Sequence, residues 1–329
     1  MWFKKLTGFD EVSPENVRKN ILIDGVNLTS KENSKSFQFG TLQIPTLNEL
    51  KEQSPPLAIY KEKIMVTEVV GDVQKLHCIP DNKNALFQAA SQFNLLEMVG
   101  PHITPEHGID IYEHDHTQGP ACAIACGAGT IYRNYFVPLN GQIGQTSTNQ
   151  IDCLDLIGEK LNNSELLLWN MSNGYFLPSK ERLLEINTQL SNFNNSQSEH
   201  LKGRLKIGIQ WDTEVTLTNQ KQIVSQAYCS ALPVAYSDIQ SFYWEHFARI
   251  ILEAAYEATL YAGLINLGKT GSNKVYLTLL GGGAFGNEPN WIMESISKSI
   301  VKFKNTPLDV RIVSYGNSKP RIQQLINEL

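Results

Sequence analysis

Short runs of β-branched and aromatic residues alternate with helical patterns over most of this 329-residue chain. Apolar runs of about four to eight residues, bounded by turn residues, are typical of buried strands. They occur at Ile64–Val70, Asn84–Ala90, Ile131–Val137, Glu165–Trp169, Leu205–Gln210, Ile223–Tyr228, 274–280 and Val310–Tyr315. Helical patterns occur at Gly119–Gly129, Glu181–Leu190, Ser241–Leu267 and 290–301. This alternation predicts an α/β domain with a mixed, largely buried sheet.

Two kinds of segment depart from this pattern. Residues 1–60 are polar and interrupted by Ser and Pro up to Ser54-Pro-Pro56, which predicts an extension that wraps the domain or is partly mobile. Asn192–Ser198 has the composition of a loop tip, and Asp212–Asn219 joins two predicted strands like a hairpin turn.

Composition and charge restrict the class of protein. Hydrophobic residues make up 42% of the chain and charged residues 19%, which is ordinary for a globular protein. The formal net charge of -5 argues against nucleic-acid binding, which needs basic patches. The N-terminus lacks the apolar core of a secretory signal, and Arg249, Glu253 and Glu257 interrupt the longest apolar stretch, Phe247–Ile265. We therefore expect a cytosolic protein without a membrane span.

The cysteines and histidines do not form a recognisable metal motif. The five cysteines include no CxxC pair, and their odd number predicts buried, reduced thiols. Cys122 and Cys126 lie four residues apart on a predicted helix, but further cysteine ligands for a metal are missing. His114-Asp-His116 has tight spacing within an acidic loop, yet loop histidines usually carry no metal. We expect no metal site and no cofactor.

The candidate chemistry begins where the strand predicted from Lys274 meets Gly281-Gly-Gly-Ala-Phe-Gly286. A helical pattern starts directly after this turn, so backbone N–H groups and a helix N-terminus would face a ligand together. That arrangement predicts an anion site, most often for phosphate. The spacing also fits the dinucleotide fingerprint G-x-G-x-x-G, although only one predicted strand follows it and Ser314-Tyr315-Gly316 offers no acid for a ribose. A Walker loop is excluded because no Lys-Ser/Thr pair follows the glycines.

Three further motifs precede or follow this turn in a characteristic order. They are Val69-Val-Gly-Asp-Val73, Ala85-Leu-Phe-Gln-Ala-Ala-Ser91 and, after Gly283-Ala-Phe-Gly286, Tyr315 at the end of the final strand. In this order the motifs resemble those of macrodomains, the ADP-ribose-binding fold, over roughly 63–136 and 241–317. The resemblance implies a three-layer α/β fold with a mixed central sheet and helices on both faces. It divides the chain into an N-terminal extension at 1–60 and a macrodomain-like domain at 61–329 with a large insertion at about 140–240.

A narrower resemblance rests on Gln88–Met98, Thr117–Ala123 and Tyr132–Tyr135. These segments are similar to a divergent macrodomain branch that contains the Legionella effector MavL. Members of that branch resemble poly(ADP-ribose) glycohydrolases and remove ADP-ribose from arginine.

The resemblance implies roles for individual residues of a ligand site. Asp72, with Val73, would recognise adenine, although an Asp that follows Gly is also a common turn or helix cap. Residues Gly281, Gly282, Gly283, Ala284, Phe285 and Gly286 would bind the diphosphate through main-chain N–H groups, with Phe285 over the distal ribose. Tyr315 would stack on adenine, or it plugs the edge of the domain.

The segment after the second strand departs from the family pattern. Gln88 and Ser91 replace two asparagines, and the first glycine-rich loop is missing. We expect Ser91, Gln92 and Asn94 to bind ribose hydroxyls, with Gln118 also at the site. This departure motivates the alternative that the protein reads ADP-ribose without cutting it.

Cleavage needs a carboxylate near the anomeric carbon of the ribose. Four acids lie in or beside the polar loop at 100–118: Asp115, Glu113, Glu97 and Asp110. We rank Asp115 first, because it lies four residues before Gly119, and a solvated acidic loop is the competing interpretation.

The leading hypothesis is an ADP-ribosyl hydrolase that removes ADP-ribose from modified protein side chains, with arginine as the linkage that the narrower resemblance implies. The alternatives are a non-catalytic ADP-ribose reader and an NAD-dependent oxidoreductase, which rests on the glycine turn alone. We expect ADP-ribose or an ADP-ribosylated protein as the partner, no nucleic acid, no membrane, and a monomer. If the protein is a bacterial effector, it would act in the host cytosol after secretion.

Overall fold

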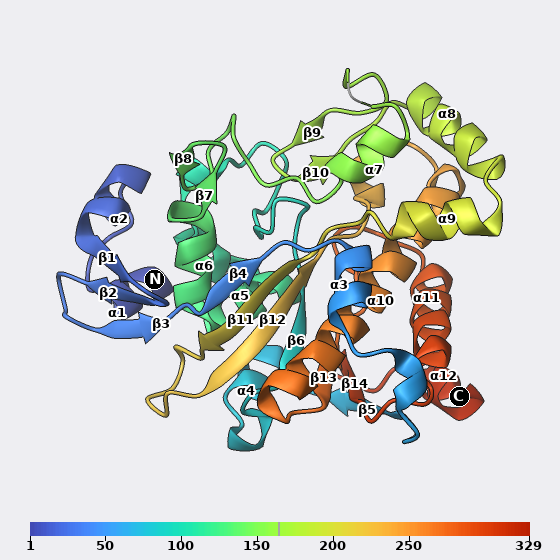
Figure 1. Cartoon of the computed structure of the whole chain (residues 1–329). Helices are drawn as coiled ribbons and strands as arrows, with labels where there is room; N and C mark the ends of the chain where they lie inside the picture. The colour runs from blue at the N-terminus through green and yellow to red at the C-terminus, as the bar shows by residue number, and fades with distance from the viewer. Residues whose placement is uncertain (164) are drawn as a thin grey trace.

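Most of the predicted strands lie in one central sheet of seven strands (Figure 1). The computed structural model describes residues 1–163 and 165–329. The strand order is β4-β11-β12-β6-β13-β14-β5, and β12, β6, β13, β14 and β5 run parallel, whereas β11 is antiparallel to β4 and β12. The strands are β4 (Thr41–Gln43), β5 (Met65–Val70), β6 (Leu86–Ala90), β11 (Gly208–Glu214), β12 (Ile223–Cys229), β13 (Lys274–Leu277) and β14 (Asp309–Ser314).

Helices cover both faces of this sheet (Figure 1). One face carries α4 (Val73–His77), α5 (Gln118–Ala125) and α6 (Gly127–Tyr135), of which α5 contacts β6 and α6 contacts β11. The other face carries α3 (Leu47–Gln53), α10 (Glu245–Thr270) and α11 (Pro289–Lys302), and α10 contacts β12, β6 and β13. The predicted three-layer α/β fold with a mixed sheet is therefore confirmed.

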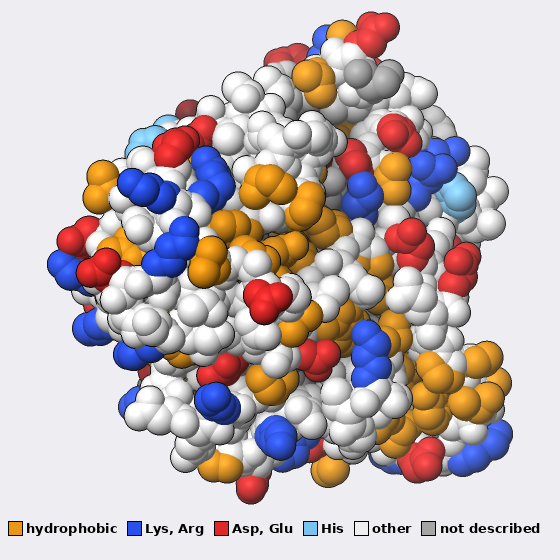
Figure 2. Space-filling view, turned by 60° about the vertical axis from the view of Figure 1, so that its left-hand side comes forward, with side chains coloured by type: hydrophobic (Ala, Val, Ile, Leu, Met, Phe, Trp, Pro, Cys, Tyr) orange, Lys and Arg blue, Asp and Glu red, His pale blue; other side chains and the backbone are white. Residues whose placement is uncertain are grey.

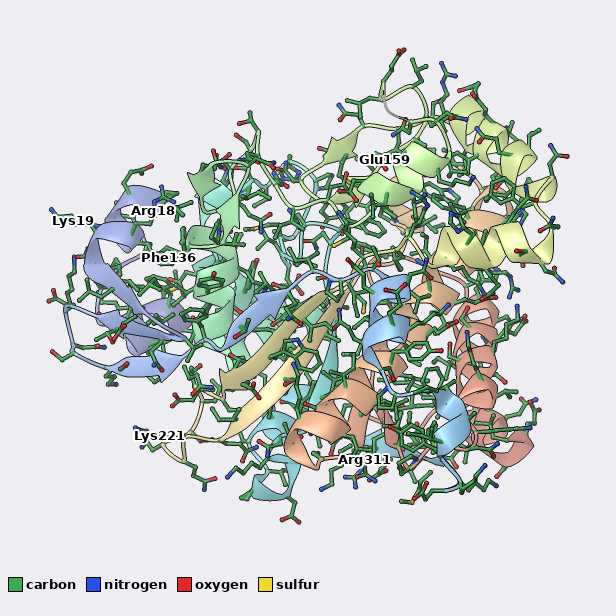
Figure 3. All side chains as sticks on the ribbon, in the orientation of Figure 1. Arg18, Lys19, Phe136, Glu159, Lys221 and Arg311 are labelled. Atoms are coloured by element: carbon green, nitrogen blue, oxygen red, sulfur yellow. The ribbon has the colours of Figure 1, made fainter. Side chains whose placement is uncertain are left out.

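Residues 1–60 lie against this domain and extend its sheet. They form α1 (Trp2–Thr7), α2 (Pro14–Asn20), a small sheet of β1 (Ile21–Asp24), β2 (Asn27–Ser30) and β3 (Ser36–Gln38), then β4 and α3. Phe3 and Leu28 share a second hydrophobic cluster with Ile131 and Tyr135 of α6. Phe136, which follows α6, packs against the same cluster and lies beside this segment (Figure 3). Apolar burial thus attaches the segment to the domain.

Two predicted strands are wrong. Ile131–Val137 is mostly helix α6, because Ala128, Ile131 and Tyr135 repeat at helical spacing and turn one face toward the second cluster. Glu165–Trp169 is a turn in which Leu166 has a φ of 55°. The side chain of Asn163 holds this turn, since its Oδ1 accepts from the N–H groups of Leu168 and Trp169.

The remaining boundaries differ in smaller ways. The helix predicted at Gly119–Gly129 breaks at Cys126, which separates α5 from α6. Asn192–Ser198 is only partly a loop, because Asn194 and Gln197 form a capping box that starts α9. The other elements are β7 (Pro138–Leu139), β8 (Gln142–Ile143), α7 (Asp155–Lys160), β9 (Met171–Ser172), β10 (Tyr175–Phe176), α8 (Lys180–Ser191), α9 (Asn195–Lys202) and α12 (Pro320–Glu328).

Helix α10 is long and apolar enough to cross a membrane by length and composition. In this fold, however, 83% of its most apolar window is buried inside the protein. It therefore serves as the core helix of one face of the sheet, as the three interrupting charges predict. On the surface drawn in Figure 2, basic side chains lie interspersed with acidic ones rather than in one basic patch.

Candidate functional site

The carboxyl ends of the five parallel strands meet at one edge of the sheet, which is where α/β proteins place their ligands. Residues directly after β5, β6, β13 and β14 line two cavities at this edge. The larger has a volume of about 1200 Å³ and the smaller about 130 Å³. Both are lined by Asp115, Thr117, Gln118, Thr278, Leu279 and Gly283, so the two cavities adjoin. A single elongated ligand that spans both would touch four strand ends.

The large cavity contains the residues predicted to hold adenine. Asp72 and Val73 follow β5, and Tyr315 follows β14, the strand paired with β5. The Oδ1 atom of Asp72 accepts a hydrogen bond of 2.8 Å from the N–H of Gln74, so this residue caps α4 and also faces the cavity. Tyr315 is 78% exposed, which leaves its ring available to a flat ligand.

The glycine turn forms the boundary between the two cavities. Gly282 lines the large one, Gly281, Ala284 and Phe285 line the small one, and Gly283 lines both. Gly281 has a φ of 75°, and a Cβ there would lie 2.6 Å from the Cβ of Ala231. The turn therefore needs glycine at this position.

Hydrogen bonds fix the shape of this turn and leave several of its donors unused. The N–H of Leu280 donates to the hydroxyl of Tyr256 at 2.8 Å, and the N–H of Asn287 donates to the carbonyl of Gly281 at 2.9 Å. Within residues 1–163 and 165–329, by contrast, the N–H groups of Gly281 and Gly283–Phe285 donate to no protein atom. A fixed loop with free N–H groups is suited to bind an anion.

The small cavity has an aromatic wall. The rings of Tyr175, Tyr236 and Phe285 contact one another with centroids 5.0 to 5.6 Å apart. Tyr175 is held in place by a 2.7 Å hydrogen bond from its hydroxyl to the carbonyl of Met98. Such a wall suits the apolar face of a sugar ring.

Two of the four predicted catalytic acids line the small cavity. Asp115 is half-buried and also lines the large cavity, and its Oδ1 accepts a 2.9 Å hydrogen bond from the N–H of Thr117. Glu97 is only 2% exposed, and neither of its carboxyl oxygens has a hydrogen-bond partner among the described residues. Gly119 permits this packing, because a Cβ there would lie 2.0 Å from the carbonyl oxygen of Ala90 and 3.1 Å from the Cγ of Glu97.

Burial raises the pKa of Glu97 to about 8, although the charge of Arg133 acts in the opposite direction. The nearby charge of Asp115 raises it further. Glu97 therefore holds a proton at neutral pH that it can release close to that pH, which is the property of a general acid or base.

The other two acids have different surroundings. Glu113 lines the large cavity but accepts a 2.8 Å hydrogen bond from the N–H of Trp2. Asp110 accepts from the N–H of Phe3 at 3.2 Å and lines neither cavity. Both tie the loop at 105–114, which contains the 3-10 helices Pro105–His107 and Asp110–His114, to the N-terminal segment.

Of the residues predicted to bind ribose, some line a cavity and one does not. Ser91 and Gln92 line the small cavity, but the Oε1 and Nε2 atoms of Gln92 bond to the backbone of Met98. Asn94 is fully buried, bonds to Gln150 and to the N–H of Leu96, and lines neither cavity. Gln118 lines both cavities and clamps β6 through the N–H of Ala90 and the carbonyl of Gln88.

Gly286 is the last of the residues predicted to bind the diphosphate. It has a φ of 68° and closes the turn without lining either cavity.

Several solved structures of poly(ADP-ribose) glycohydrolases align with this chain. The enzyme from Thermomonospora curvata covers 96% of this chain and 96% of its own, with 11% identity and a TM-score of 0.46. The enzyme from Deinococcus radiodurans in complex with ADP-ribose covers 86% of this chain and 90% of its own, with 8% identity and a TM-score of 0.43. No protein-family model matches the chain, and no curated protein does. The function must therefore be argued from the site itself.

Sequence reasoning missed three residues of this site. Tyr175 and Tyr236 come from the insertion, where neither belongs to a motif, so no signal could have placed them at the cavity. Thr278 lines both cavities and directly follows β13, but the sequence pattern placed it inside the strand predicted at 274–280.

The histidines and cysteines were the candidates for a metal site or a reactive thiol. Of the residues that the structure describes, no three His, Cys, Asp or Glu side chains are arranged to hold a metal ion. Cys122, Cys126, Cys153 and Cys229 are buried free thiols, and Cys78 is half-buried. Burial raises the pKa of each of these thiols, which makes them poor nucleophiles.

Proposed function

We propose that the protein is an ADP-ribosyl hydrolase that releases ADP-ribose from modified protein side chains. The observation that carries this proposal is the position of two carboxyl groups, Glu97 and Asp115, in a small cavity separated from a larger one by a loop with free N–H groups. A ligand with a base at one end, a diphosphate in the middle and a sugar at the other end matches this order of features.

The pose follows from the chemistry of each feature. Adenine would lie in the large cavity between the carboxylate of Asp72 and the exposed ring of Tyr315. The diphosphate would accept hydrogen bonds from the free N–H groups between Gly281 and Phe285. The distal ribose would then enter the small cavity against Phe285 and Tyr175, beside both acids.

In this pose the two acids divide the reaction between them. The bond between the anomeric carbon and the side-chain atom breaks as the oxygen of a water molecule bonds to that carbon. Glu97 donates its proton to the departing side chain, and Asp115 accepts the proton of the water. The products are free ADP-ribose and the unmodified side chain.

The finer assignments are also proposals. We propose arginine as the modified side chain, following the resemblance to the MavL branch. We propose an ADP-ribosylated protein as the partner and a monomer as the active form. For the location we propose the cytosol, which is that of a host cell if the protein is a secreted effector.

The test is release of free ADP-ribose from proteins modified on arginine, serine or glutamate. Asp115→Ala and Glu97→Gln should each lower the rate at least 100-fold, the lower end of what a general acid or base contributes. Both variants should retain ADP-ribose binding in calorimetry. Glu106→Gln is the matched control, because Glu106 is an acid of the same loop that lines neither cavity. Full activity of Asp115→Ala would refute the role of Asp115.

The same experiment separates the two alternatives. Micromolar binding of ADP-ribose without release from any linkage would identify a reader, which the internally bonded side chains of Gln92 and Asn94 favour. Tighter binding of NAD than of ADP-ribose, together with a change in nicotinamide absorbance, would identify an oxidoreductase. One titration with ADP-ribose, AMP and NAD thus ranks all three functions.

A further inference from the structure

Arg133 of α6 is completely buried, and its guanidinium group is held from several sides. Its Nε donates to the carbonyl of Leu95 at 3.1 Å, and its Nη2 donates to the hydroxyl of Thr130 at 3.2 Å. The guanidinium carbon lies 3.6 Å from the centroid of the Tyr228 ring. Contacts with the loop after β6, with α6 itself and with β12 fix the position of this charge in the protein interior.

The same guanidinium faces the acid of the small cavity. Its Nη2 lies 3.6 Å from Oε1 of Glu97, which is too long for a good hydrogen bond and short enough for a strong charge interaction. Nη1 of Arg133 and both carboxyl oxygens of Glu97 are buried without a hydrogen-bond partner within the described part of the chain. A buried cation and a buried acid that do not satisfy each other are costly, so this arrangement calls for an explanation.

Among the residues that the structure describes, Arg133 is the cation that pairs with Glu97. The titratable groups around this acid are Tyr112 from the loop before α5, Asp115, Cys122 of α5 and Tyr228 of β12. None of these four carries a positive charge in any protonation state.

We propose that Arg133 is a positioning residue that holds Glu97 at the small cavity and sets the pH at which this acid gives up its proton. This inference rests on the proposed function. It adds that the two residues work as one unit: burial raises the pKa of Glu97, and the charge of Arg133 lowers it again.

The surroundings of Tyr228 explain why the cation cannot move away from Glu97. The hydroxyl of Tyr228 donates to Oε1 of Gln226 at 2.5 Å. The Nε2 of Gln226 in turn donates to the carbonyl of Cys122 at 2.8 Å and lies 3.0 Å from Nε2 of His77. This buried chain of contacts immobilises the ring on which the guanidinium stacks.

The test compares pH–rate profiles of the wild type, Arg133→Met and Arg133→Lys. The rate of the wild type should fall on the alkaline side with a midpoint near pH 8, the pKa of Glu97. Loss of the charge in Arg133→Met should move this midpoint up by about one to three pH units, the usual effect of one nearby opposite charge. Arg133→Lys keeps the charge and should restore the midpoint toward the wild-type value, even if kcat falls because the planar contacts are lost.

A purely structural role predicts a different result. Both variants would then lower kcat at every pH and leave the midpoint unchanged, which would overturn the proposal. If Arg133→Met does not fold, Arg133→Gln, which also lacks the charge, takes its place, and the infrared carboxyl band of Glu97, identified by subtraction of Glu97→Gln, reports the titration in each variant. A Glu97 band that titrates at its ordinary value near pH 4.5 in the wild type would also refute the proposed coupling between Arg133 and Glu97.

The infrared titration needs no turnover, so it separates the two proposals. A band that titrates near pH 8 in a protein that releases no ADP-ribose would refute the hydrolase and retain the coupling between Arg133 and Glu97.

Discussion

Replacing Gly281 with alanine tests whether the glycine turn is a strained, fixed structure. The φ of 75° at Gly281 is left-handed, which costs a residue with a Cβ about 1–2 kcal/mol. The new Cβ would also lie 2.6 Å from the Cβ of Ala231 and 2.7 Å from Nδ2 of Asn287, and overpacking of this kind costs about 1–3 kcal/mol. We therefore expect a total cost of about 2–4 kcal/mol, allowing for partial relaxation.

This cost should appear in one of two measurements. If the turn keeps its shape, the free energy of unfolding in urea falls by that amount. If the turn relaxes, stability is spared and the affinity for ADP-ribose in calorimetry falls instead, by roughly 30-fold to several hundred-fold, since about 1.4 kcal/mol corresponds to a factor of ten. The loss in unfolding free energy and the loss in binding free energy should together amount to about 2–4 kcal/mol.

Gly283→Ala is the matched control for stability. This glycine lies in the same turn, its φ is not left-handed, and nothing lies within 4 Å of its added Cβ. The free energy of unfolding should change by no more than about 0.5 kcal/mol. If Gly281→Ala matched Gly283→Ala in stability and the wild type in affinity, the argument that this turn is fixed by its backbone conformation would be wrong.

Three further substitutions test other parts of the site. Asp72→Asn keeps the cap of α4 and should leave the urea midpoint close to that of the wild type while weakening ADP-ribose binding in calorimetry, whereas Asp72→Ala should also lose about 1 kcal/mol of stability. Tyr256→Phe removes the hydroxyl that donates to the carbonyl of Thr278 at 2.9 Å and accepts from the N–H of Leu280, so unfolding in urea should become easier by about 1–3 kcal/mol. Burial raises the pKa of Glu68, but hydrogen bonds from donors at the end of β14 and the start of α12 outweigh it and lower the pKa from 4.5 to about 2. The stabilisation by Glu68 is therefore fully present above pH 4.5 and lost as the pH falls through about 2. Glu68→Gln should cost about 1–2 kcal/mol at pH 7. Its difference from the wild type in urea unfolding should shrink between pH 4.5 and pH 2, and a difference that is constant with pH would contradict this account.

The sequence was sufficient for the parts of the fold that depend on local pattern. Strands at Ile64–Val70 and Ile223–Tyr228 were predicted because β-branched residues fill them and turn residues bound them, and the structure confirms both within one or two residues. Ile131–Val137 failed because its composition favours a strand while its burial repeats at helical spacing. Tertiary contact with the N-terminal segment decides between the two, and that contact is not visible in a local window.

The site was predictable to the extent that its residues follow strand ends. Asp72, Ser91 and Tyr315 each come directly after a parallel strand or its first turn, so the topology places them together. Tyr175 reaches the small cavity from the insertion, and the interaction of Arg133 with Glu97 depends on how α6 packs beneath a loop. Neither relation has a signature in sequence spacing.

The pairing of β4 with β11 has a consequence for the order in which this protein folds. Gln43 pairs with Ile209, and the apolar side chains of the N-terminal segment pack on α6. During synthesis β4 therefore has no strand partner until residues 209–211 of β11 have been added, and Phe3 and Leu28 lack their partners on α6 until Tyr135 has been added. Contacts of such long sequence separation form slowly and leave the nascent chain open to aggregation. Residues 1–60 therefore dock in two steps that follow their own synthesis, first on α6 and then on β11.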